Sequence, residues 1–207
     1  MTPAYGLDIE TDTARGGLDP RRCRVLAAAI AGPSGRSVFT GTERAVIADL
    51  DELLASLPPG LIVTWNGSAF DLPFLATRAR RAGVETGLRL ALDPGIAMSH
   101  PPLAGHEGAY RAAWYAHRHL DAYRAYRSLE EPGSCALKAV ARRRGLDVVD
   151  ADPTRVHELR TNALRRYVAR DAELALQLAQ MREPDVNPFV DDPPGQTAAW
   201  RFHSAWA

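Results

Sequence analysis

The chain has 207 residues, of which 46% are hydrophobic and 24% are charged, and its formal net charge at pH 7 is zero. This composition is that of a globular protein with one well-buried domain, and the zero net charge excludes nucleic-acid binding through a global basic field. No apolar run approaches the roughly 20 residues that span a bilayer, and the first residues lack the pattern of a signal peptide. Cys23 and Cys135 lack the spacing of zinc or redox motifs. We therefore expect a cytoplasmic protein without membrane contact.

The first 65 residues predict a strand-rich opening. Short apolar runs stand between turn residues, as in strands, and Thr42 suits the N-cap of a helix that ends before Pro58-Pro59-Gly60. The run 61–65 is continuously apolar, which predicts a central parallel strand. The expected elements are strands at 4–9, 23–31, 36–40 and 61–65 and a helix at 42–57.

The remaining residues predict alternating helices and strands. Gly83 and Gly145 are placed to end helices, and Ser134 is placed to begin one. Residues 86–115 contain several prolines and glycines, so we expect a loop-rich insertion there. The further elements expected are helices at 68–82, 122–127, 135–144 and 162–181 and a strand at 117–121.

These elements predict one α/β domain over residues 1–182 and a Pro- and Asp-rich tail over 183–207. The five expected strands form a mixed sheet that opens with an antiparallel meander and carries helices on both faces. The tail contains Trp200, Phe202 and Trp206, which can pack on the domain or contact a protein partner.

Three carboxylates stand at positions that suit a metal site. Asp8 and Glu10 lie two residues apart on the first expected strand, so their side chains share one face and their repulsion requires a cation or a solvated edge. An isolated pair of this kind is commonly a solvent-facing strand end, but the buried character of this strand favours metal binding. Asp71 follows the run 61–65, and ligands gather at the carboxyl ends of such strands. Its alternative role is to complement the helix dipole.

Tyr167 and Asp171 lie four positions apart on the last expected helix. Residues at this spacing project from one face, one turn apart. The carboxylate can therefore bind a metal ion while the phenol contacts the same reacting centre. The spacing is common on amphipathic helices, so it indicates a metal site only together with the acids upstream.

Together these segments resemble the DnaQ-like DEDD exonucleases of the RNase H-like fold. Asp8-x-Glu10 matches the first exonuclease motif of that superfamily. The string 66–71 matches the second motif, in the form found in proofreading domains of family B polymerases and their stand-alone relatives. Tyr167-x-x-x-Asp171 matches the third motif of the tyrosine subclass, DEDDy.

Two further segments support this resemblance, which covers residues 4–181. The stretch His119-Leu120-Asp121 resembles the His-x-Asp strand of the family, and residues 134–140 resemble one of its helices. Arg166 stands where the histidine subclass would have its histidine. Three motifs in order are a far stronger signal than any one of them.

The resemblance implies a metal-dependent 3′-5′ exonuclease that releases nucleoside 5′-monophosphates from a single-stranded 3′ end of DNA or RNA. Carboxylate ligands favour Mg²⁺ or Mn²⁺, and two such ions promote in-line hydrolysis of a phosphodiester. By resemblance, Asp8 bridges both ions, Glu10 and Asp171 share one, and Asp71 holds the other mainly through water. Tyr167 would orient the attacking water, since a phenol with a pKa of about 10 is a poor base at neutral pH.

The same resemblance suggests residues for substrate binding. Thr11 follows the first motif and is expected beside the terminal nucleotide. Phe70 is expected either to stack on a base or to pack in the core, and Asn66 either to bind the strand backbone or to hold its turn. Arginines within 165–170 flank the third motif and can contact phosphates, although such runs are usually a solvated helix face.

Two other functions use the same fold. An RNase H-like endonuclease would employ the same carboxylates, and the tyrosine in the third motif argues against it. A non-catalytic nucleic-acid-binding protein would not need all four acids and the tyrosine intact. The histidines lack the i, i+4 pairing of a zinc site, so no transition-metal site is expected.

Overall fold

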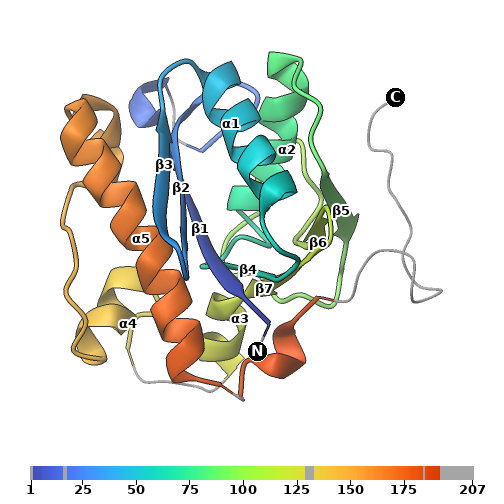
Figure 1. Ribbon diagram of the computed structural model, residues 1–207, viewed down its shortest axis with the longest axis vertical. Helices are drawn as coiled ribbons and strands as arrows, with labels where there is room; N and C mark the ends of the chain where they lie inside the picture. Colours follow the sequence, from blue (N-terminus) through green and yellow to red (C-terminus); the bar gives the residue numbers. More distant parts are fainter. Residues whose placement is uncertain (1, 16–17, 129–132, 184, 192–207) are drawn as a thin grey trace.

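The computed structural model describes residues 2–15, 18–128, 133–183 and 185–191, and these form one seven-stranded mixed sheet (Figure 1). The strand order is β3-β2-β1-β4-β7-β6-β5. Strands β1, β4 and β7 run parallel to one another, whereas the other neighbours pair antiparallel. The strands are β1 (Ala4–Thr11), β2 (Val25–Gly32), β3 (Gly35–Thr40), β4 (Leu61–Thr64), β5 (Leu88–Leu92), β6 (Tyr110–Trp114) and β7 (His117–Asp121).

The prediction of five strands is wrong, because β5 and β6 lie inside the region 86–115 that we expected to be loop. The two strands pair antiparallel in register from Leu88↔Trp114 to Leu92↔Tyr110. Each has only five residues, and the 17 residues of 93–109 separate them. No short turn signal links them in the sequence, so the pairing depends on the rest of the sheet.

Helices cover both faces of the sheet, as predicted (Figure 1). The core cluster of β1 and β2 includes apolar residues of α1 and α2, while the alternate residues of β2 pack with α5. Thr42 is the N-cap of α1, and Gly83, at φ 65°, is the left-handed C-cap of α2. The helices are α1 (Glu43–Ser56), α2 (Asp71–Ala82), α3 (Ala122–Ser128), α4 (Leu137–Arg143) and α5 (Thr161–Met181), with short 3₁₀ turns η1 (Thr13–Arg15), η2 (Pro153–Glu158) and η3 (Asn187–Phe189). No helix within the described ranges is long and apolar enough to cross a membrane.

A close crossing of α5 over β1 brings the two halves of the chain together. A Cβ atom added at Gly6 would lie 2.0 Å from the backbone oxygen of Ala172, so the helix packs directly on the strand at this point. Ala27 and Ala29 of β2 are buried beside the same helix, and their small side chains leave room for it. Because side chains alternate along β1, the face of Gly6 that meets α5 also carries Asp8 and Glu10.

The described part of the predicted tail packs on the sheet. Val190 forms an isolated antiparallel bridge with Leu120 of β7, and Asp191 is only 2% exposed. Trp200, Phe202 and Trp206 lie outside the described residues.

Candidate active site

Three of the predicted ligands meet where α5 crosses β1. Asp8 and Glu10 belong to β1, and Asp171 precedes the residue of α5 that contacts Gly6. One carboxylate oxygen from each of the three lies within 4.8 Å of the others. Residues 163 positions apart in the sequence thus form one acidic cluster, which we call the carboxylate triad.

Asp71 approaches the triad from the other layer of helices. It is the first residue of α2, it is 4% exposed, and its carboxyl group receives a hydrogen bond from the Ile9 backbone. Ile9 stands between Asp8 and Glu10, and the charge of Asp71 contributes to the raised pKa of both. The fourth predicted ligand is therefore adjacent to the triad without being one of its three members.

Burial dominates the electrostatics of these acids. Loss of hydration raises the pKa of Asp8 and of Glu10 well above their ordinary values, and the neighbouring carboxylates raise both further. Burial likewise raises the pKa of Asp71 to about 7 and that of Asp171 to about 6. Asp71 and Asp171 are buried, and Asp8 and Glu10 are half-buried. Mutually repelling carboxylates with so little hydration are unfavourable unless protons or cations neutralise them.

Lys138 supplies one positive charge next to the triad. Its Nζ lies 3.0 Å from Asp171 Oδ2 and 3.4 Å from the ring centroid of Tyr167. It lowers the pKa of Asp171, although burial still outweighs it. Sequence reasoning did not assign Lys138 to the site. The available signal was its uniqueness, because every other basic residue in the chain apart from the histidines is arginine.

Tyr167 lies one helical turn before Asp171, as its spacing predicted. It is 6% exposed, and burial together with Glu10 and Asp171 raises the pKa of its hydroxyl far above the ordinary value. The phenol is therefore protonated at neutral pH, which suits a hydrogen-bond donor and excludes a general base.

The three residues expected to bind substrate lie at the same end of the sheet. Thr11, at the end of β1, is 4% exposed. Asn66 adopts a left-handed φ of 68°, and its backbone N–H donates to Asp121 Oδ1 at 2.8 Å, so it does hold its turn. Phe70 is half-buried and packs on Phe74 with ring centroids 5.5 Å apart, so at least part of its ring belongs to the core.

Most arginines named from the sequence have protein partners. Arg165 donates to Thr40, and Arg170 donates to Asp147 O and pairs with Glu173. Arg166 is exposed. The arginines near the third motif thus include two that help to fix α5 to its neighbours.

The triad fits a hard divalent cation. All its donors are carboxylate oxygens, which Mg²⁺ and Mn²⁺ prefer, and the triad is the sole such group of acids, histidines or cysteines in the described residues. Asp171 Oδ1 is buried and has no hydrogen-bond partner among the described atoms. An orphaned buried carboxylate oxygen beside two further carboxylates is suited to bind a metal ion.

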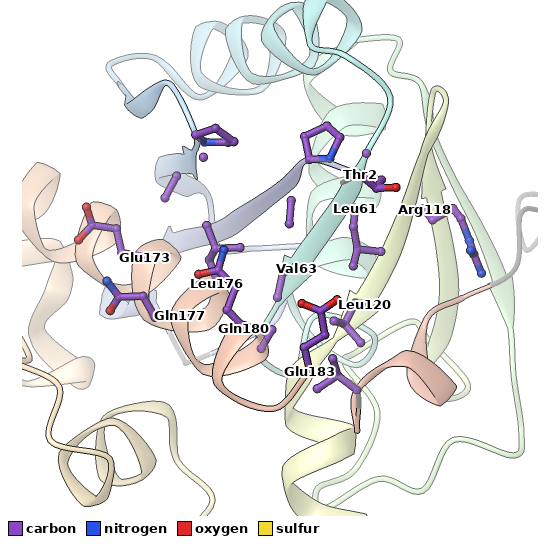
Figure 2. A pocket seen from close by; sticks show the side chains of 18 of the residues that line it. Thr2, Leu61, Val63, Arg118, Leu120, Glu173, Leu176, Gln177, Gln180 and Glu183 are labelled. Atoms are coloured by element: carbon purple, nitrogen blue, oxygen red, sulfur yellow. The ribbon is translucent and has the colours of Figure 1, made fainter.

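A cavity of about 890 Å³ lies away from the acids. It is bounded by the amino ends of β1 and β4 and by the second half of α5 (Figure 2). Leu61, Val63, Leu120 and Leu176 line it, and none of the four acids does. This cavity is therefore separate from the carboxylate triad.

Comparison with known proteins agrees with this geometry. A family model described as the RNase H superfamily matches residues 7–162. The chain belongs to the RNase H superfamily. The match includes three of the four acids and Lys138, and it ends in the first turn of α5, before Asp171.

Two similar proteins are DNA polymerases. A 44-residue stretch, 21% of this chain, is 46% identical to a DNA polymerase of Archaeoglobus fulgidus and covers 6% of it. The structure of the family B DNA polymerase from Pyrobaculum calidifontis matches with a TM-score of 0.71 and 25% identity over 87% of this chain. The chain spans only 24% of that polymerase, and this superfamily member is therefore similar to one part of a much longer protein.

Proposed function

We propose that the protein is a metal-dependent 3′-5′ exonuclease of the DEDDy subclass. The observation that carries this proposal is the triad of Asp8, Glu10 and Asp171 within 4.8 Å, with Asp71 adjacent and Tyr167 one turn from Asp171. The superfamily match and the similarity to family B polymerases support a nuclease. The tyrosine in the third motif favours the exonuclease over an endonuclease on the same fold.

Two divalent cations, Mg²⁺ or Mn²⁺, are the proposed cofactors. The triad would hold them together with Asp71, with Asp8 contributing to both. Bound cations would activate the attacking water and stabilise the leaving 3′ oxygen. The raised pKa values of the four acids mean that cations compete with protons for this site.

The other residues of the site orient the substrate and the water. The Tyr167 hydroxyl donates a hydrogen bond to the water that attacks the terminal phosphodiester. Lys138 fixes Asp171 and the Tyr167 ring relative to each other, because its ammonium contacts both. Thr11, Asn66 and the exposed part of Phe70 contact the terminal nucleotide of a single strand.

The test uses single-stranded DNA and RNA oligonucleotides of one sequence, labelled at the 5′ end, together with covalently closed circles. With Mn²⁺ or Mg²⁺ the wild type should shorten linear strands from the 3′ end and release nucleoside 5′-monophosphates, whereas EDTA should stop the reaction. Cleavage of circles would replace the proposal with an endonuclease. Binding of all substrates without cleavage in either metal would favour the non-catalytic alternative.

A further inference from the structure

A buried relay of three side chains connects the last described residue with the end of β4. Thr64 Oγ1 lies 2.8 Å from His119 Nε2, and His119 Nδ1 lies 2.8 Å from Asp191 Oδ2. The three residues are 0%, 1% and 2% exposed. A hydroxyl, an imidazole and a carboxylate in this order form the catalytic triad of many hydrolases. Here no substrate reaches the hydroxyl, so the relay serves another purpose.

Asp191 is inserted where the pairing of β6 with β7 stops. The ladder contains the pairs Trp114↔His117 and Ala113↔Arg118, and the next pair would place Ala112 opposite His119. Instead, the Ala112 N–H donates to Asp191 Oδ2 at 3.0 Å, and the Asp191 N–H donates to the carbonyl of His119 at 2.7 Å. Asp191 thus substitutes for strand pairing at this point.

A carboxylate can only accept, so the contact with Asp191 determines which nitrogen of His119 carries the proton. Asp191 Oδ2 accepts from His119 Nδ1–H at 2.8 Å, while Arg124 Nη1 lies 3.0 Å from Asp191 Oδ1. In the Nδ1–H tautomer, Nε2 accepts the proton of the Thr64 hydroxyl. Asp191 therefore sets, through His119, the orientation of the Thr64 hydroxyl.

Thr64 faces the loop that leads to Asp71. A Cβ atom at Gly67 would lie 2.2 Å from Thr64 Oγ1, so the loop packs directly on this hydroxyl. Asp121 holds the same loop through the N–H groups of Asn66 and Ser68, at 2.8 and 3.1 Å. The side chains of β7 at positions 119 and 121 thus both fix the segment 64–68.

We propose that Asp191 is a positioning residue for Asp71, acting through His119 and Thr64 on the loop 64–70. The expected loss of activity rests on the proposed exonuclease function, whereas the expected loosening of the loop does not. Asp191 lies 29 residues beyond the stretch that matches the superfamily model. Through the relay, the segment 185–191 thus contributes to the function of the domain.

The test is Asp191→Asn, which keeps the shape of the side chain but adds an N–H donor. The amide should donate to His119 Nδ1 and drive the imidazole to the Nε2–H tautomer, which ¹⁵N NMR of the ring distinguishes. The hydroxyl of Thr64 then loses its acceptor, and backbone amide exchange over residues 66–71 should accelerate. We expect kcat on a single-stranded oligonucleotide to fall about 10-fold with KM unchanged, the lower end of losses for outer-shell partners.

Asp51→Asn is the matched control. Asp51 of α1 is another buried carboxylate, and it receives hydrogen bonds from Gly87 N–H, just before β5, and from Trp114 Nε1–H of β6, without contacting His119 or Thr64. Its substitution should lower thermal stability while leaving the His119 tautomer, the exchange of residues 66–71 and kcat unchanged. A loss of kcat in both variants in proportion to stability would overturn the positioning role.

Thr64→Val tests the relay from its other end if Asp191→Asn does not fold. It removes only the hydroxyl, so the Asp191–His119 contact stays, yet the exchange of 66–71 and kcat should change as in Asp191→Asn. Wild-type exchange in this variant would overturn the proposal. If wild-type protein cleaves nothing, the exonuclease function fails, but the tautomer and exchange results still decide on the relay.

Discussion

Two sets of carboxylates in this protein differ in what surrounds their oxygens. Asp51 accepts from Gly87 N–H at 2.9 Å, from Trp114 Nε1–H at 2.7 Å and from the Tyr115 hydroxyl. Asp191 accepts from Ala112 N–H, from His119 Nδ1–H and from Arg124. These partnered acids have a donor for every oxygen, so neither is available to bind a cation.

Among the described residues, the carboxylate triad has fewer such donors. Lys138 Nζ forms an ion pair with Asp171 Oδ2, and Asp171 Oδ1 has no hydrogen-bond partner. Each member instead has other carboxylates as neighbours, which raises the pKa of Asp8 and Glu10. Asp171 is as buried as Asp51, so the missing donors rather than burial distinguish the set that is suited to cations.

The largest expected effect comes from removing a carboxylate of the triad. Asp8→Asn keeps the volume of the side chain but removes a negative ligand, so kcat should fall by more than the about 100-fold typical of outer-shell losses. The same change relieves repulsion, so the melting temperature of the metal-free protein should rise. Oligonucleotide cleavage and thermal denaturation in EDTA measure the two effects. Asp51→Asn should show the opposite pattern, with activity kept and stability reduced, and a shared pattern would break the distinction.

Removal of the Lys138 charge beside the triad should have the next largest effect. Lys138→Met keeps an unbranched chain of similar length but deletes the charge that contacts Asp171 and Tyr167. The pKa of Asp171 should rise further, because Lys138 now lowers it, and kcat should fall about 10- to 100-fold, as for other outer-shell partners of a metal site. Part of this loss should disappear at higher pH, where the acids ionise without help. An equal loss at pH 6 and pH 9 would contradict the electrostatic role.

A smaller effect is expected from Tyr167→Phe. The change deletes one hydroxyl and keeps the ring over which Lys138 lies. Loss of one hydrogen bond worth about 1 kcal/mol corresponds to roughly a 5- to 10-fold lower kcat, while Mn²⁺ affinity measured by calorimetry should stay that of the wild type. Asp171→Ala should lower both. Reduced metal affinity in Tyr167→Phe would show that the tyrosine supports the ligands rather than the water.

The sequence predicted which acids lie together better than it predicted the number of strands. Period-2 spacing places Asp8 and Glu10 on one face, and i, i+4 spacing does the same for Tyr167 and Asp171, whatever the wider fold. The family resemblance then joined the two pairs. Strands β5 and β6 were missed because their pairing spans a 17-residue loop and depends on β7. Local spacing can be deduced from the sequence, whereas long-range strand pairing depends on tertiary contacts.

The same limit explains Lys138 and Asp191. Their roles arise only when α4 packs beside α5 and when the segment 185–191 lies against β7. Lys138 was nonetheless visible as the one lysine of the chain. Asp191 stands in a stretch of prolines and aspartates that predicted a tail outside the domain, and nothing in its local sequence marks it as buried.

The smallest expected effect, a pH dependence of stability, also separates the two sets. The pKa of Asp71 in the folded protein is about 7 and that of Asp171 about 6, above the unfolded value of about 3.9. The folded state therefore holds more protons than the unfolded state between these limits, and stability falls as pH rises through them. In EDTA the melting temperature should decline from about pH 4 to pH 7, and Asp71→Asn should decline less steeply than the wild type. Mn²⁺ should then raise the melting temperature more at pH 7 than at pH 5, since fewer protons must leave the ligands. An equal Mn²⁺ shift at both pH values would mean that these acids are already ionised and partnered, which would place them with Asp51 and Asp191 instead.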